Sequence, residues 1–290
     1  MFIFLDGVGL GVSNPKVNPF VAARTPFLES LLGGKLNGAT GEKTEALFTF
    51  KHLDANLGHP GLPQSATGQT ALLTGKNGAD IMDGHYGPYP GPTLKKVLDE
   101  GSLFSEMPKG SAALANAYPP GYFAALKRRK QKMNVPVYAA LQAGLRQRTL
   151  EDYLKGDALS VDLTGAYLQG LEPNLELITP AESGQRLVDM ARRYSFAFFD
   201  FWSTDYAGHR SSFADCVTLI EKLDEFLSTA LDASEDLTCL LTSDHGNLED
   251  KTTKGHTRNT VPLIVCGAEA SAFAHASSIL DIAPILRKLL

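Results

Sequence analysis

The chain has 290 residues, 43% hydrophobic and 20% charged, which is an ordinary composition for a soluble protein with a sizeable core. Its formal net charge of -5 gives no reason to expect nucleic acid or an anionic membrane as a partner. The three cysteines are far apart, which indicates reduced thiols, and the start MFIFLDG lacks the features of a signal peptide. We therefore expect a cytoplasmic protein with no membrane-spanning segment.

The first third of the chain alternates a short buried strand with helices. Residues 2–5 (FIFL) predict a buried strand of a parallel sheet, because the run is short, apolar and followed by Asp-Gly. Residues 25–33 predict a helix with a threonine N-cap and a proline in its first turn. Residues 65–75 (SATGQTALLTG) predict a second helix, which ends at its terminal glycine.

The section from about residue 76 to 178 has a different character. Proline, glycine and a basic run interrupt the periodicity, and strand-like segments are scarce. We interpret residues 76–178 as a small, mainly helical cap inserted into the core domain. Its segment NAYPPGYF, 116–123, could line a substrate pocket or pack its aromatic rings in a core.

Regular alternation returns after residue 178. The helix that begins there carries a capping box, formed by Thr179 and Glu182. Further strands are predicted at 196–202, 238–244 and 260–267, with helices at 213–231 and 277–290. Alternating strands and helices are typical of a three-layer α/β domain with a largely parallel sheet. Residues 1–75 and 179–290 would form this core.

Aspartate and histidine side chains follow the predicted strands. Such positions meet at one edge of a parallel sheet, where open α/β proteins bind ligands. Each residue alone could be a turn residue or a helix cap. As a set they are typical ligands of divalent ions such as zinc or manganese, and six are enough for two metals. The set comprises Asp6, Asp205, His209, Asp244, His245 and His256.

Ser65 stands at the start of the second predicted helix. It could simply cap that helix. Alternatively, the helix dipole and free amides there favour an anion, and a nearby metal would turn the hydroxyl into a nucleophile.

The ordered motifs FLDGVG, SATGQ, DYAGH, SDHGN and GHTRNTVPLIV resemble those of the alkaline phosphatase superfamily of metalloenzymes. Within that superfamily they are most similar to the branch of cofactor-independent phosphoglycerate mutase and phosphopentomutase. The resemblance implies an alkaline-phosphatase-like core that binds two divalent ions, Zn²⁺ or Mn²⁺. One ion would be held by Asp205, His209 and His256. The ligands of the other would be Asp6, Asp244, His245 and the Ser65 oxygen.

The resemblance also implies that Ser65, at the first position of the family motif, is the nucleophile and forms a phosphoserine. The chain departs from the mutases at Gln69, where they usually carry histidine, and its insertion is much shorter than their second domain. Thr67, Gln69, His85 and Arg258 are the candidate substrate-binding residues. The basic run KRRK, 127–130, is more typical of a solvated surface than of a phosphate clamp.

We therefore expect a metal-dependent phosphomonoesterase that acts on a small phosphorylated metabolite. The alternatives are a phosphomutase, a phosphodiesterase or nucleotide pyrophosphatase, and a catalytically silent metal-binding protein. The sequence gives no indication of the oligomeric state.

Overall fold

The computed structural model describes residues 1–128, 131–232 and 236–290. A seven-stranded sheet has the order β2-β3-β9-β8-β1-β7-β4. Its four strands β8, β1, β7 and β4 run parallel, and β9, β3 and β2 continue the sheet with antiparallel pairing. The strand bounds are Phe2–Leu5 (β1), Lys43–Thr44 (β2), Phe48–Leu53 (β3), Ala112–Leu114 (β4), Phe196–Phe201 (β7), Cys239–Thr242 (β8) and Val261–Cys266 (β9).

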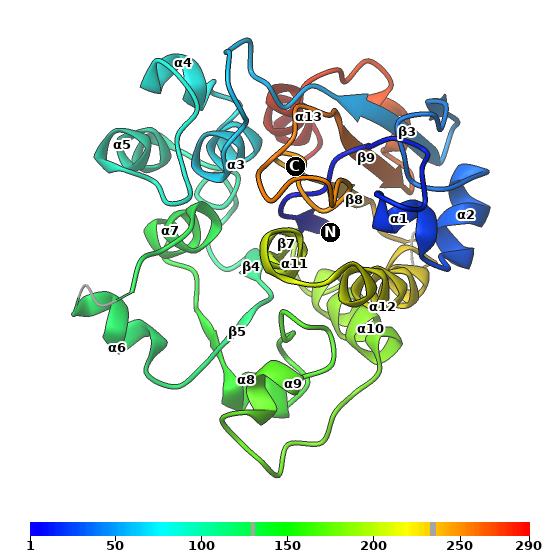
Figure 1. Cartoon of the computed structure of the whole chain (residues 1–290). Helices are drawn as coiled ribbons and strands as arrows, with labels where there is room; N and C mark the ends of the chain where they lie inside the picture. Colours follow the sequence, from blue (N-terminus) through cyan, green and yellow to red (C-terminus); the bar gives the residue numbers. More distant parts are fainter. Residues whose placement is uncertain (129–130, 233–235) are drawn as a thin grey trace.

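Helices cover both faces of this sheet (Figure 1). The helices on one face are α3 (Ser65–Thr74), α5 (Pro92–Glu100), α7 (Val135–Gln142) and α13 (Ile282–Leu289). Those on the other face are α1 (Pro19–Ala22), α2 (Pro26–Leu32), α10 (Pro180–Ala191) and α12 (Phe213–Asp232). The prediction of a three-layer α/β core with a largely parallel sheet is confirmed.

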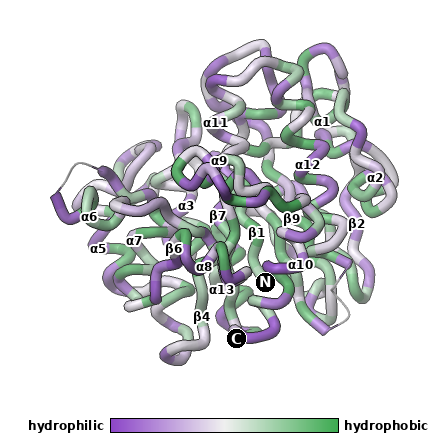
Figure 2. Tube along the Cα trace, turned by 90° about the horizontal axis from the view of Figure 1, so that it is seen from below, coloured by the Kyte–Doolittle hydropathy of each residue, from purple (hydrophilic) through white to green (hydrophobic). Residues whose placement is uncertain are grey.

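The sheet separates two hydrophobic cores because successive strand residues point to opposite faces. In β1, Phe2 and Phe4 join the core beneath α3, whereas Ile3 and Leu5 join the core beneath α12. The central strands are accordingly mostly hydrophobic (Figure 2), with Asp200 of β7 as a buried exception. Strands buried on both faces are expected to form continuous apolar runs, as FIFL does.

The interval 76–178 does not form a separate cap throughout. Its strand β4 is the edge strand of the main sheet, paired with β7, and α5 and α7 pack in the main core. Only the remainder has a small core of its own, around Tyr153 and Leu168. The expected boundary at residue 76 is therefore corrected, because part of the interval after it belongs to the main domain. Strand β4 is too short to be recognised from the sequence.

The remaining short elements lie around the small core near Tyr153 and Leu168 or in the connections between longer elements. The strands β5 (Ala117–Tyr118) and β6 (Arg148–Thr149) form a parallel pair. The short helices are α4 (Gly78–Met82), α6 (Tyr122–Lys127), α8 (Leu150–Leu154), α9 (Ala166–Gln169), α11 (Ser203–Arg210), η2 (Ala270–Phe273) and η3 (Ile279–Asp281). Among the described residues, no helix is both long enough and apolar enough to cross a membrane.

The predicted helix ends are confirmed where glycine or a capping box marks them. Gly75 ends α3 with φ of 69°, and Gly33 ends α2 with φ of 73°, in the left-handed region that glycine tolerates. Thr179 and Glu182 exchange the two hydrogen bonds of a capping box at the start of α10. Thr25 is at the N-cap of α2, but its side chain makes no capping hydrogen bond there.

Candidate metal centre

The predicted Asp and His residues come together at the carboxyl edge of the parallel strands. Asp6 follows β1, and Asp244 and His245 follow β8. Asp205 and His209 are on α11, the helix after β7, and both lie on one face because they are four residues apart. His256 reaches the same place from the loop before β9.

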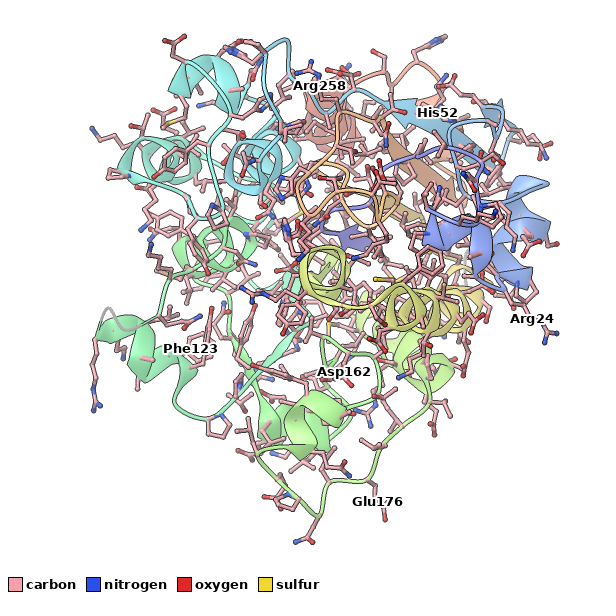
Figure 3. All side chains as sticks on the ribbon, viewed as in Figure 1. Arg24, His52, Phe123, Asp162, Glu176 and Arg258 are labelled. Atoms are coloured by element: carbon pink, nitrogen blue, oxygen red, sulfur yellow. The ribbon has the colours of Figure 1, made fainter. Side chains whose placement is uncertain are left out.

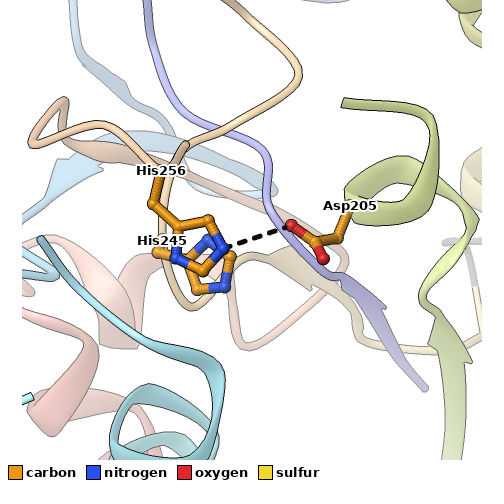
Figure 4. A group of neighbouring side chains, drawn as sticks. All are labelled: Asp205, His245 and His256. Atoms are coloured by element: carbon orange, nitrogen blue, oxygen red, sulfur yellow. Dashed lines mark ion pairs between the residues drawn. The ribbon is translucent and has the colours of Figure 1, made fainter. Parts of the chain in front are cut away.

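Three donor atoms are spaced as one metal ion requires. The Nε2 atoms of His209 and His256 are 3.2 Å apart, and Asp205 Oδ1 lies 3.4 and 3.6 Å from them. Tetrahedral bonds of about 2.0 Å place ligand atoms about 3.3 Å apart. These distances fit the predicted Asp205, His209 and His256 ligand set. The close approach of His256 to Asp205 is drawn in Figure 4.

A second set of donors surrounds the Nε2 atom of His245. Asp6 Oδ1 is 3.4 Å, Asp244 Oδ2 is 3.6 Å and Ser65 Oγ is 3.0 Å from this nitrogen. The imidazole ring of His245 stacks on that of His256 with centroids 3.8 Å apart, so the two sets are adjacent. His245 can also combine with Asp205 and His256 as a three-residue ligand group.

Backbone carbonyls fix the orientation of the histidine rings. His209 Nδ1 lies 2.7 Å from the carbonyl oxygen of Lys254, and His256 Nδ1 lies 2.7 Å from that of Pro63. A carbonyl only accepts, so each Nδ1 carries the proton and each Nε2 lone pair faces the site. Two lone pairs 3.2 Å apart repel each other, and a cation between them removes that repulsion.

The carboxylates of the site also favour a cation. Burial and the negative charges of Asp244 and Asp205 raise the pKa of Asp6 well above its usual value. Burial and Asp205 raise the pKa of Asp244 to about 7. Asp6 Oδ1 is buried and has no hydrogen-bond partner among the described residues. Since a buried unpaired oxygen is costly, the residues present fit divalent metal ions.

The histidines are in the protonation state that metals need. Burial lowers the pKa of His245, and burial together with His245 lowers the pKa of His256. Both rings are therefore neutral at physiological pH, and neutral imidazole is the metal-binding form.

Ser65 is the first residue of α3 and is buried beside the second donor set. The close approach of α3 depends on Gly68, because a Cβ there would lie 2.8 Å from the backbone oxygen of Asp244. Gln69 lies one helical turn after Ser65. Its side chain donates to Asp6 Oδ2 at 3.1 Å and to Asp244 Oδ2 at 3.0 Å. Gln69 thus binds two carboxylates of the candidate metal centre.

The other candidate substrate residues lie elsewhere. Thr67 is fully buried and donates to the carbonyl oxygen of Gln64, so it stabilises the first turn of α3. Arg258, labelled in Figure 3, donates to carbonyl oxygens of the 59–61 loop. His85 lies near His59, with its ring centroid 6.4 Å away. None of the three belongs to the described wall of the cavity above the site.

The basic residues of the insertion are on the surface or are bonded within the protein. Lys127 and Arg128 are exposed, as expected, and residues 129 and 130 of the same run lie outside the described residues. Arg146 forms an ion pair with Asp152. Arg148 is buried and donates to the carbonyl oxygen of Leu114.

Two neighbouring residues organise the centre without being part of the predicted ligand set. Asn247 donates to Asp205 Oδ1 at 2.6 Å and so orients this carboxylate. Glu249 is completely buried, and its carboxylate accepts hydrogen bonds from Gly9 N, Asn247 N, Thr257 Oγ1 and Asn259 Nδ2. Glu249 therefore ties together three loops that carry donor residues.

The fold and site together define an α/β protein with two adjacent Asp/His donor sets and a serine beside them. The metalloenzyme superfamily model matches residues 1–290, so the chain belongs to the metalloenzyme superfamily. The predicted resemblance to alkaline-phosphatase-like metalloenzymes is thereby confirmed at the level of the superfamily.

Curated relatives match only part of the chain. The 2,3-bisphosphoglycerate-independent phosphoglycerate mutase of Cereibacter sphaeroides is 29% identical over 124 residues, covering 40% of this chain and 24% of the mutase. The mutase of the same name from Aliivibrio fischeri is 32% identical over 106 residues, covering 33% of this chain and 21% of the mutase. The matched segment thus spans about a quarter of these relatives.

Solved structures match over nearly the whole chain and support the fold. The PH0037 protein from Pyrococcus horikoshii has a TM-score of 0.57 and 15% identity, with 99% of this chain and 96% of that chain covered. The cold-active alkaline phosphatase from Shewanella has a TM-score of 0.55 and 13% identity, with 100% and 99% covered.

Proposed function

We propose that this protein is a two-metal phosphomonoesterase that acts through a phosphoserine at Ser65. The observation that carries this proposal is the position of the Ser65 hydroxyl, 3.0 Å from His245 Nε2 and beside the second donor set. Two adjacent divalent ions, when bound by the two donor sets, would supply a lowered hydroxyl pKa and charge stabilisation for phosphoryl transfer.

The residues of the chain would perform the remaining tasks. Ser65 Oγ forms a bond to phosphorus, its proton is released, and the bond from phosphorus to the ester oxygen breaks. The departing alkoxide takes up a proton from water, and the hydroxide that remains is neutralised by the proton released from Ser65. Water then attacks the phosphoserine, which returns Ser65 and releases inorganic phosphate. Gln69 and Asn247 would keep the carboxylates of Asp6, Asp244 and Asp205 oriented during both steps.

Phosphomutase activity is the second candidate, because both reported curated relatives are phosphoglycerate mutases. In that case an alcohol rather than water would accept the phosphoryl group from Ser65. The short insertion favours hydrolysis, since a mutase must keep water away from the phosphoserine.

The test is to incubate the Zn²⁺- or Mn²⁺-loaded protein with phosphate esters and to measure inorganic phosphate. We expect metal-dependent release that falls by at least about a thousandfold in Ser65→Ala. The control is Ser228→Ala, at a half-buried position of α12 outside the cavity wall. Isomerised ester without phosphate would identify a mutase. If neither product forms while the metals are bound and the fold is intact, the alternative of a catalytically silent metal-binding protein is supported.

A further inference from the structure

A large cavity opens directly above the candidate metal centre. Its volume is about 1200 Å³, and its floor includes Asp6, Ser65, Gln69, Asp205 and His256. A phosphate group at the metals would occupy only a small part of this space. The remaining volume is therefore available for the alcohol portion of a phosphate ester.

The walls of this cavity hold large apolar side chains that water reaches. Five of the exposed large hydrophobic residues of the described chain line it: Leu62, Tyr89, Tyr167, Leu171 and Tyr206. Contiguous exposed apolar surface of this kind marks a binding site, because burying it against a ligand is favourable.

The aromatic rings of the walls form two groups. Tyr118 and Tyr122 stack with centroids 4.8 Å apart. Trp202 makes edge contacts with Tyr167 at 6.3 Å and with Tyr206 at 6.5 Å. Such rings offer faces and edges on which a flat ligand ring can stack.

The polar groups of the walls suit a neutral ligand. Burial, with Asp200, Tyr89 and Tyr167 nearby, raises the pKa of Tyr122 to about 12, so its hydroxyl remains neutral. The wall also contributes the amide side chains of Asn116 and Asn134. Neutral hydroxyl and amide groups hydrogen-bond uncharged polar substituents of a ligand.

Apart from histidine, each cationic side chain in the described part of the walls lies over a tyrosine ring. Lys132 Nζ lies 5.5 Å from the ring centroid of Tyr89, and the Arg210 guanidinium carbon lies 5.8 Å from that of Tyr206. Recognition of a carboxylate on the ligand would instead call for an arginine whose guanidinium can donate two parallel hydrogen bonds to it.

We propose that this cavity binds the alcohol portion of the substrate and that this portion is an uncharged, ring-bearing group. Aryl phosphates and nucleoside monophosphates carry such a group, whereas glycerol phosphate lacks the ring and phosphoglycerate adds a carboxylate. The inference rests on the proposed phosphoester chemistry of Ser65, and it adds the class of leaving group.

The chain provides its own reporter, because Trp202 is its single tryptophan and lines the cavity. The Ser65→Ala protein, loaded with Mn²⁺, is titrated with phenyl phosphate, adenosine monophosphate, glycerol 3-phosphate and 3-phosphoglycerate while tryptophan fluorescence is recorded. We expect at least one ring-bearing ester to bind about tenfold more tightly than glycerol phosphate. Comparison of phenyl phosphate with the nucleotide separates the two sources of the ring.

A matched pair of leucines controls for non-specific effects. Leu171 and Leu177 are 53% and 51% exposed, but only Leu171 is in the cavity wall. Leu171→Ala and Tyr167→Ala should each weaken binding of the ring-bearing ester several-fold. Leu177→Ala should leave it unchanged.

The two proposals fail in different ways. Equal binding of all four esters, or tightest binding of phosphoglycerate, would overturn the ring-bearing leaving group. Equal losses in Leu171→Ala and Leu177→Ala would also overturn it. Failure of the phosphatase proposal would instead appear as binding of a ring-bearing ester with no phosphate released by the wild-type protein.

Discussion

At the scale of single residues, the buried carboxylate of Glu249 shows how loops are held in place for function. It accepts four hydrogen bonds, from backbone and side-chain donors of the 7–11, 245–250 and 257–259 segments. Each of these segments adjoins a predicted metal ligand. These hydrogen bonds therefore fix the geometry of the candidate metal centre as well as stabilise the fold.

Glu249→Gln should lower the free energy of unfolding by about 2–3 kcal/mol, because the amide NH₂ cannot accept the bonds that one carboxylate oxygen accepts. Urea denaturation at pH 7 measures the change. Glu225→Gln, at an exposed position of α12, should have almost no effect. Equal stabilities of the two variants would contradict the role given to Glu249.

That these Asp and His residues come together could be predicted because they follow strand ends, where a parallel sheet gathers ligands. Glu249 could not, since an isolated glutamate has no characteristic spacing. Trp202 and Tyr206 were also missed, because aromatic residues next to a strand are equally typical of a core. Thr67 is a predicted substrate-binding residue, but in the first turn of α3 its hydroxyl donates to the backbone carbonyl of Gln64.

At the scale of elements, α3 must approach the end of β8 closely to bring Ser65 to the site. Gly68→Ala would place a Cβ 2.8 Å from the backbone oxygen of Asp244. The clash with rigid backbone should lower the free energy of unfolding by about 1–3 kcal/mol and weaken metal binding. Gly34→Ala is the control, since no atom of the described residues lies within 4 Å of its added Cβ. Thermal unfolding with and without Mn²⁺ compares them.

Helix α8 provides a test of pH dependence away from the metal centre. Burial opposes ionisation of Asp152, but hydrogen bonds from Thr149 N and the Arg146 guanidinium outweigh it, so the pKa of Asp152 is below its usual value. Folding thus favours the ionised form. The contribution is complete above the unfolded-state pKa and is lost as pH falls through the folded-state pKa.

Asp152→Asn should accordingly lower the free energy of unfolding by about 1–3 kcal/mol at pH 7. The difference from wild type should shrink below about pH 4, the usual pKa of an aspartate in an unfolded chain. Urea denaturation at a series of pH values measures it, with exposed Asp232→Asn as the control. A difference that stayed constant down to pH 2 would disagree with a lowered pKa.

The longer elements could be predicted from sequence and the shorter ones could not. The helices at 65–74 and 180–191 have clear end signals, and the buried strands are continuous apolar runs. By contrast, β4 has three residues, and β3 was not recognised in FTFKHL although its residues partly alternate. Pairing with β7 and β9 stabilises these strands, and such long-range contacts are not visible in a local pattern.

At the scale of the whole molecule, the metal centre joins segments from both ends of the chain. Its donors come from the loop after β1, from α3, from α11 and from the connection between β8 and β9, so bound ions would cross-link distant parts of the sequence. In the metal-free protein the carboxylates of Asp6, Asp205 and Asp244 repel one another. Metal binding should therefore stabilise the entire fold.

Removal of metal with a chelator should lower the melting temperature, and added Zn²⁺ or Mn²⁺ should restore it. One site stabilises the native state by about 2.7 kcal/mol when free metal is at a hundred times its Kd. Calorimetry measures the shift. Asp205→Asn should reduce it, whereas Asp215→Asn, on the exposed side of α12, should not. A melting temperature insensitive to both chelator and metal would refute the proposed two-metal centre.

The cavity and the metal centre are built from largely different stretches of sequence. The donors belong to the sheet edge, whereas many wall residues lie at 116–125 and 161–171, in segments that connect β4 to β7 and lie outside the main sheet. Sequence changes in these segments can therefore alter the shape of the proposed leaving-group pocket while the donor atoms keep their spacing. The molecule is in this sense modular: one segment can diversify during evolution, or be exchanged by an engineer, without a new catalytic apparatus.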